Sequence, residues 1–290
     1  MYKISFLVIF SLIAHVCHAQ FDYRNTDRSA IPIVGKQYGL VGLGFTSMLN
    51  NRDDINADGR LDQETINFNW ATGIDFVNWK RPHFGYGAQI LYWNTGAKYT
   101  GYDSLTKLNL EATTKLSYLK IPLLVYYKSY NRYKPEKRLR FNAFFGPYIA
   151  IMNDFSDEVS FIDKNVDPVV KNTSVFGPAG YSFNGTTGGS IESPIYQPLD
   201  YGFILGSGVE LRLWRRTVVA LGLRTDIGFV DVEFKGQNKL TPEGGVSNDF
   251  GYWNGLYAKY YNNIDPNNIP NRPTTRTFNF GSYLTIKKFF

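Results

Sequence analysis

Cysteine and histidine are scarce in this chain of 290 residues, which contains one Cys and three His. A disulfide framework and a zinc site built on several cysteines are therefore excluded. Charged residues make up only 19% of the sequence, against about 25% in an average soluble domain. The mean hydropathy of −0.26 is too low for a bundle of membrane helices, which needs several apolar runs of about 20 residues.

Aromatic residues, in contrast, are abundant, with 21 Tyr and 22 Phe in the chain. A disordered protein would lack them. A transmembrane β-barrel accommodates them, because its strands alternate apolar and polar residues and aromatic girdles lie at both membrane surfaces. The formal net charge of +6 is small for the chain length, and no basic helix concentrates it. We therefore expect no nucleic-acid partner.

The first residues have the pattern of an export signal. An apolar run over residues 4–14 follows Lys3, and Ala19 supplies the small residue at a cleavage site. Cleavage there would leave His83 as the single histidine. The expected organisation is a signal peptide at 1–19, an N-terminal periplasmic segment at 20–35 and a barrel domain at 36–290.

From residue 36 onward the sequence alternates apolar and polar residues, and no window keeps a helical period over three turns. In the last stretch, Phe278 and Phe280 fall on one face, whereas Asn279 and Thr285 fall on the other. Such alternation places one face in an apolar medium and the other in a polar one. We expect eight strands, at about 36–50, 67–76, 84–101, 118–127, 138–155, 200–213, 217–234 and 278–290.

The polar faces of these strands are rich in Gly and carry few charges. A soluble sandwich would expose many Lys, Glu and Thr to water, whereas the narrow lumen of an eight-stranded barrel needs small residues and paired charges. The sequence thus predicts an all-β fold, an eight-stranded antiparallel up-and-down transmembrane β-barrel with long extracellular loops. We expect a lumenal ion network with a structural role, formed by Asp75, Lys120, Arg140, Glu210, Arg212, Arg224, Asp226 and Lys287.

Long and short connections alternate along the chain. The long ones cover about 51–65, 102–113, 156–198 and 235–273, and the short ones cover 80–83, 131–137 and 215–216. Outer-membrane barrels have long outer loops and short periplasmic turns. This pattern predicts a bacterial outer-membrane protein with both chain ends on the periplasmic side.

Residues 118–128 read Tyr-Leu-Lys-Ile-Pro-Leu-Leu-Val-Tyr-Tyr-Lys. This stretch resembles the Tyr-Leu-Glu-Ile-Pro-Leu-Leu strand of the PorT-like outer-membrane β-barrel family of Bacteroidota. Gly-Pro-Tyr at 146–148 and Asp-Tyr-Gly-Phe at 200–203 are also similar to that family. The likeness departs at Lys120, where the family usually has an acidic residue.

The resemblance covers roughly residues 36–155 and 198–290. It implies a barrel in the outer membrane, and the family includes a factor needed for type IX secretion and gliding motility. The terminal aromatic residue Phe290 is, by the same resemblance, usual in chains handed to the outer-membrane assembly machinery. The family supplies no catalytic residues.

The first long loop resembles part of an EF-hand calcium loop. Gly59 stands at the sharp turn, but Thr65 replaces the bidentate carboxylate and no helices flank the loop. A weak calcium site is expected, with a dissociation constant of about 10⁻⁴–10⁻³ M. The alternatives are a solvated acidic loop and one that pairs with lipopolysaccharide through divalent ions. The candidate ligand positions are Asp54, Asn56, Asp58, Arg60 and Asp62.

Catalytic chemistry has little support in the sequence. Enzymes on small outer-membrane barrels act near the outer rim, whereas His83 maps to a periplasmic turn, so the usual base is at the wrong end. Asp157 and Glu158 fall in the third outer loop, where we expect both carboxylates to be solvated. The alternative is an acid-only site formed by this pair.

The fourth loop combines aromatic rings with several Asn residues. This mixture is typical of recognition surfaces, and the alternative is a small aromatic core folded over the barrel mouth. The rings that form this candidate partner or ligand surface are Tyr252, Trp253, Tyr257, Tyr260 and Tyr261.

We therefore expect a non-enzymatic, monomeric barrel with a structural or partner-binding role in the envelope. Its expected contacts are outer-membrane lipid, lipopolysaccharide and envelope or secretion-complex proteins, with no cofactor except a structural calcium in loop 51–65. A small-solute porin is the first alternative, and it would need ten or more strands. A lipid A-modifying barrel enzyme is the second.

Overall fold

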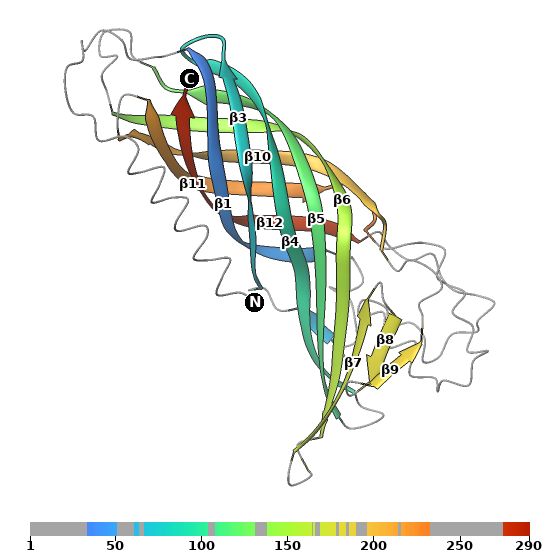
Figure 1. Ribbon diagram of the computed structural model, residues 1–290. Coiled ribbons are helices and arrows are strands. Elements are labelled where there is room, and N and C mark those ends of the chain that lie inside the picture. Colours follow the sequence, from blue (N-terminus) through green and yellow to red (C-terminus); the bar gives the residue numbers. More distant parts are fainter. Residues whose placement is uncertain are drawn as a thin grey trace. The chain divides into compact units, whose positions relative to one another are not determined.

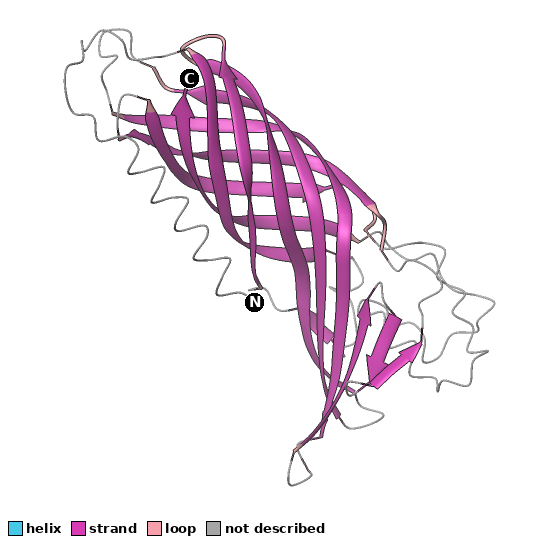
Figure 2. Ribbon diagram, in the orientation of Figure 1, coloured by secondary structure: helices cyan, strands magenta, loops and turns pink. Residues whose placement is uncertain are grey.

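The structure is a computed structural model, and the ribbon is coloured along the chain in Figure 1 and by secondary structure in Figure 2. It describes residues 34–50, 61–63, 67–103, 108–130, 138–163, 165, 169–177, 180–183, 186–189, 196–213, 216–232 and 275–290. The chain divides into one unit at Met1–Ile31 and another at Pro32–Phe290. The expected signal peptide and most of the N-terminal segment lie outside the described residues. Within the described ranges, no helix is long and apolar enough to cross a membrane.

Eight long strands form a closed antiparallel wall, in which each strand pairs with the next one along the chain. The ring is closed by pairing of the first strand with the last, as between Gly39 and Lys287. The eight-stranded up-and-down barrel predicted from the sequence is therefore confirmed. The wall strands are β1 (Gly35–Asn50), β3 (Phe68–Trp79), β4 (Phe84–Asp103), β5 (Leu108–Lys128), β6 (Leu139–Asp163), β10 (Leu199–Arg212), β11 (Thr217–Gly228) and β12 (Arg276–Phe289).

Side chains on the wall strands alternate between buried and exposed positions. In β12, for example, Asn279 and Thr285 are buried, whereas Phe280 and Leu284 are exposed. The exposed apolar side chains face the membrane, because a lipid-facing surface needs apolar residues on every second position. The buried positions line the lumen.

Three strands continue well beyond the closed wall. The pairing of β6 with β10 ends at Leu199 opposite Ile151, whereas β5 and β6 stay paired out to Asn109 opposite Ile162. β4 and β5 end as a hairpin at Asp103 and Leu108. Residues 102–103 and 108–113 are thus strand, so the prediction of a loop over 102–113 was wrong.

Short strands add to these extensions on both sides. β2 (Leu61–Gln63) pairs with β4, and β7 (Val170–Gly177) pairs with the end of β6. β8 (Gly180–Phe183) and β9 (Thr186–Gly189) follow in the same sheet, and Figure 1 shows them apart from the ring. We call residues 98–103, 108–117 and 153–163, together with β2, β7, β8 and β9, the outer sheet. The connection at 156–198 therefore contains strands, but these do not enter the wall.

A bulge marks the start of the outer sheet on β6. Tyr118 of β5 pairs with Met152, but the preceding Ser117 pairs with Asp154, which leaves Asn153 as an extra residue. A bulge of one residue reverses which alternate side chains face inward. In the part of β6 that precedes the bulge in the sequence, the even-numbered residues are buried. After the bulge, the odd-numbered Asp157 is buried.

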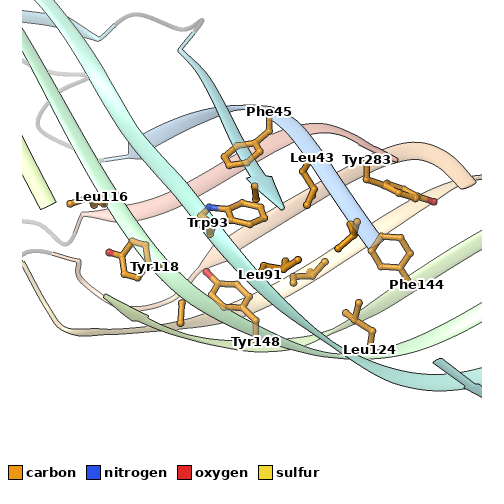
Figure 3. Packing of buried hydrophobic residues seen from close by; sticks show 14 of the residues in the cluster. Leu43, Phe45, Leu91, Trp93, Leu116, Tyr118, Leu124, Phe144, Tyr148 and Tyr283 are labelled. Carbon is orange, nitrogen blue, oxygen red and sulfur yellow. The ribbon is translucent and has the colours of Figure 1, made fainter. Parts of the chain in front are cut away.

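The lumen is packed with side chains, and many of them are aromatic. Figure 3 shows Trp93, Tyr118, Phe144, Tyr148 and Tyr283 converging with aliphatic side chains between the strands. The sequence predicted a lumen of glycines and paired charges, so the abundance of rings inside was missed. The small residues make room for these rings.

Gly206 illustrates this packing. A Cβ atom at this position would overlap the ring of Phe144. The glycine of β10 therefore allows a large ring from the neighbouring β6 to lie across it. This is close packing of the kind found in protein interiors, rather than an open channel.

Candidate functional site in the barrel lumen

The centre of the lumen contains a buried carboxylate held by two cations. The carboxylate of Asp226, in β11, forms an ion pair with the ammonium of Lys120, in β5. Oδ2 and Nζ are 2.6 Å apart. Arg224 binds the same carboxylate through two hydrogen bonds, Nε to Oδ1 at 2.7 Å and Nη2 to Oδ2 at 2.9 Å. All three side chains are almost inaccessible to solvent. This geometry provides the charge pairing that buried ions require.

The same chain of interactions continues to the other side of the barrel. Arg224 donates from Nη1 to Oε1 of Gln89, and Nε2 of Gln89 donates to the hydroxyl of Tyr126. Tyr126 donates to Oδ1 of Asp75 at 2.9 Å, and Asp75 pairs with the ammonium of Lys287 at 2.6 Å. Side chains from five strands are thus joined in one polar chain, which we call the central network.

Aromatic rings surround the ammonium groups of this network. Nζ of Lys120 lies 3.6 Å from the ring centre of Tyr148 and 4.0 Å from that of Trp93. Nζ of Lys287 lies 4.8 Å from the ring centre of Tyr126. Rings stabilise cations through their negative faces, and more strongly where water is excluded. The lumenal rings therefore solvate the buried charges as well as filling space.

The remaining three predicted lumenal charges lie at the end of the barrel that carries the short turns. Arg140 of β6 is directly opposite Glu210 of β10, and Arg212 follows two residues later on the same face of β10. All three are buried. The structure therefore places the eight predicted residues in two groups, the central network and this group at the short-turn end.

Sequence reasoning missed the uncharged members of the central network. Gln89 and Tyr126 connect Arg224 to Asp75. The prediction used charged residues on the strand faces, and these two side chains are uncharged. The available signal was position, because each lies on the buried set of alternating residues in its strand. A cavity of about 10 Å³ lies between them and Thr285, with room for about one water molecule.

Two predicted sites lie largely or wholly outside the described residues. Asp54, Asn56, Asp58 and Arg60 of the calcium loop are not described, and only the backbone of Asp62, in β2, is. The five aromatic residues at 252–261 also lie outside. In the described part of the chain, no group of three or more His, Asp or Glu side chains is arranged to hold a metal ion.

Asp157 lies in the outer sheet and not in a solvated loop. Its side chain is 1% exposed, and the Tyr196 hydroxyl donates to the carboxylate at 2.8 Å. Burial raises the pKa of Asp157 to about 6, although hydrogen bonds from Thr114 and Tyr196 oppose the shift. The prediction of a solvated Asp157 was wrong because the bulge turns this residue inward.

His83 lies in the short turn between β3 and β4, as the sequence indicated. Its Nδ1 is 3.3 Å from the carbonyl oxygen of Lys128, and its ring stacks on Tyr127. These contacts fasten the turn to the end of β5. These contacts give the histidine a structural role in the turn.

Comparison with solved structures finds other outer-membrane barrels. Neisserial surface protein A is 8% identical, with a TM-score of 0.32, and the match covers 88% of this chain and 99% of that one. OprG from Pseudomonas aeruginosa is 10% identical, with a TM-score of 0.39, and the match covers 89% and 97%. No curated protein matches the chain.

A protein-family comparison gives a direct assignment. The model of the outer membrane protein beta-barrel domain matches residues 39–233, which is more than half of the chain. The matched segment begins in β1 and ends after β11, so it includes seven of the eight wall strands. The protein is therefore a β-barrel of the bacterial outer membrane, and it belongs to the outer membrane protein beta-barrel domain family.

Proposed function

We propose that this barrel is a non-enzymatic, non-conducting scaffold that holds a partner-binding sheet at the cell surface. The observation that carries the proposal is the continuation of β4, β5 and β6 beyond the closed wall. Outer-membrane barrels place their long connections outside the cell. The outer sheet therefore stands on the extracellular side.

The outer sheet offers apolar groups that the membrane does not cover. Val169, Val170 and Val175 lie in or beside β7, and each is more than one third exposed. Among the described residues, β7 pairs with the extension of β6 and with no strand of the closed wall, so these valines lie beyond the lipid-facing band. Exposed apolar residues on a sheet are suited to protein recognition.

A finer assignment within the family belongs to the same proposal. The resemblance of residues 118–128 to PorT-like barrels supports a partner among envelope or secretion-complex proteins, including those of type IX secretion or gliding motility. Calcium in loop 51–65 and contacts with lipopolysaccharide would then organise the same extracellular side. The filled lumen supports neither the porin alternative nor an enzyme site inside the barrel.

Site-specific photo-crosslinking in intact cells tests the partner-binding function. A photoreactive amino acid at Val175 should give a discrete crosslinked protein, whereas the same residue at the lipid-facing Leu205 should not. Both positions are exposed and apolar, so they differ mainly in location. The proposal fails if positions 170 and 175 yield no protein adduct in cells that carry the folded barrel.

A further inference from the structure

The periplasmic end of the lumen carries more positive than negative charge. Lys128 ends β5, Arg140 lies at the start of β6, and Arg212 ends β10. Glu210 is the acidic side chain that interacts electrostatically with all three cations. For these four buried side chains the formal balance is 3 − 1 = +2. We call them the basic mouth.

Arg212 is the unusual member of the basic mouth. The residue is only 7% exposed, yet Nε, Nη1 and Nη2 have no hydrogen-bond partner within the described part of the chain. A buried guanidinium without partners is costly, because it has lost water and gained nothing in exchange. Three donors with a fixed planar geometry are therefore left for an acceptor that is not part of the described chain.

A second donor without a partner lies at the same end of the lumen. Nε2 of Gln37, near the start of β1, has no acceptor among the described residues. Its Oε1 accepts a hydrogen bond from Nε1 of Trp79 at 2.7 Å, and Nζ of Lys128 lies 3.8 Å from the ring centre of Trp79. Gln37 is thus connected to the basic mouth, and what it lacks is again an acceptor.

We propose that the basic mouth is a binding site for a phosphate dianion that enters from the periplasm. The excess of cations over the single carboxylate at the mouth favours an anion. The guanidinium fork of Arg212 fits two oxygen atoms of one phosphate group. Inorganic phosphate and a phosphate monoester share this chemistry.

The surroundings of the mouth favour entry of such an anion. Arg138, Arg216, Lys80 and Arg81 are exposed in or beside the short turns at this end. An excess of one charge sign at the rim raises the local concentration of the opposite ion and speeds its association. The site is separate from the outer sheet, so it does not depend on the proposed surface function.

Calorimetric titration of the refolded full-length barrel in detergent micelles tests the proposal. The probes are inorganic phosphate, glycerol 3-phosphate and acetate, each at the same ionic strength. Phosphate should bind, and Arg212→Gln should weaken its binding about tenfold or more, because charge-assisted hydrogen bonds are lost. The matched control is Arg216→Gln, which removes an exposed charge at the same end.

The outcomes separate the site from general attraction by the rim. Loss of phosphate binding in Arg212→Gln but not in Arg216→Gln supports the site, and the stronger of the two phosphate probes identifies the source. Arg212→Lys keeps the charge without the fork and should bind more weakly than the unaltered protein. Equal binding of acetate and phosphate, equal loss in the two glutamine variants, or no binding by the unaltered protein would each overturn the proposal.

Discussion

Asp226 is the single residue that neutralises two buried cations in the centre of the lumen. Its carboxylate is the shared partner of Lys120 and Arg224, and all three are buried between rings and strands. In a site with little water, a cation that loses its partner keeps its desolvation penalty without the compensating attraction. The central network therefore acts as a unit and not as a set of separate pairs.

Replacement of Asp226 by Asn should destabilise the barrel by about 3–5 kcal/mol, because two buried cations lose their counter-ion. The measurement is urea unfolding of the refolded protein in detergent micelles or lipid vesicles. Glu111→Gln is the control, because Glu111 pairs with Lys171 at 3.4 Å on the exposed outer sheet. An exposed pair contributes about 0–1 kcal/mol, so similar losses in the two variants would contradict this account.

The charged members of the lumen could be predicted from the sequence, but their partners could not. A charge on the lipid-facing set of alternating residues is costly, so Lys120 and Asp226 had to face inward. These two residues are 106 positions apart in the chain, and no local pattern indicates that they meet. Gln89 could not be identified because an uncharged amide on an inward face has many other roles.

At the scale of elements, the alternation of residues predicts which side chains of β6 face inward up to the bulge at Asn153, but not beyond it. The wall part of β6 follows the expected period, so the faces of Arg140 and Phe145 were predictable. Beyond Asn153 the parity reverses, and the same counting assigns Asp157 to the wrong environment. A one-residue bulge cannot be recognised in this part of the sequence, because both faces of β6 carry polar residues after Asn153.

The extension of β6 should respond to pH through Asp157. Burial raises the pKa of this carboxyl from 3.8 to about 6, so the folded outer sheet binds the proton more tightly than the unfolded chain. The resulting stabilisation is fully present below pH 3.8 and is lost as pH rises through about 6. This difference between the two pKa values corresponds to about 3 kcal/mol of stabilisation of the folded outer sheet at low pH.

Hydrogen exchange of the backbone amides in residues 154–163 measures this effect. After correction for intrinsic exchange rates, protection should be higher at pH 4.5 than at pH 7.5. In Asp157→Asn the side chain still accepts from Tyr196 but does not titrate, so the difference should disappear. A pH dependence of equal size in the Asn variant would assign the effect to another group.

At the scale of the whole molecule, the barrel is a packed solid rather than a pore. Rings such as Phe144 and Tyr283 cross the lumen, and the central network spans it from β5 and β11 to β3 and β12. An eight-stranded barrel has an interior just wide enough for its own side chains. The strands added at 156–198 do not widen it, because they join the outer sheet.

Insertion of the purified barrel into planar bilayers should therefore give no stable single-channel current. Ions would have to displace paired charges and packed rings at the same time. The Asp226→Asn variant, if it inserts, should show more frequent irregular current than the unaltered protein, because its network is broken. A stable open level in the unaltered protein would favour the porin alternative.

The continuity of β4, β5 and β6 from the wall into the outer sheet has a consequence for biogenesis. The outer parts of these strands carry charged residues, including Lys115 and Asp154, and they must cross the hydrocarbon layer before the ring closes. Charge is costly at the bilayer centre. The three strands add their charged outer parts to the barrier that every outer connection faces. Translocation of these hairpin tips, and not pairing of the lipid-facing strands, would then set the pace at which the protein reaches its mature form.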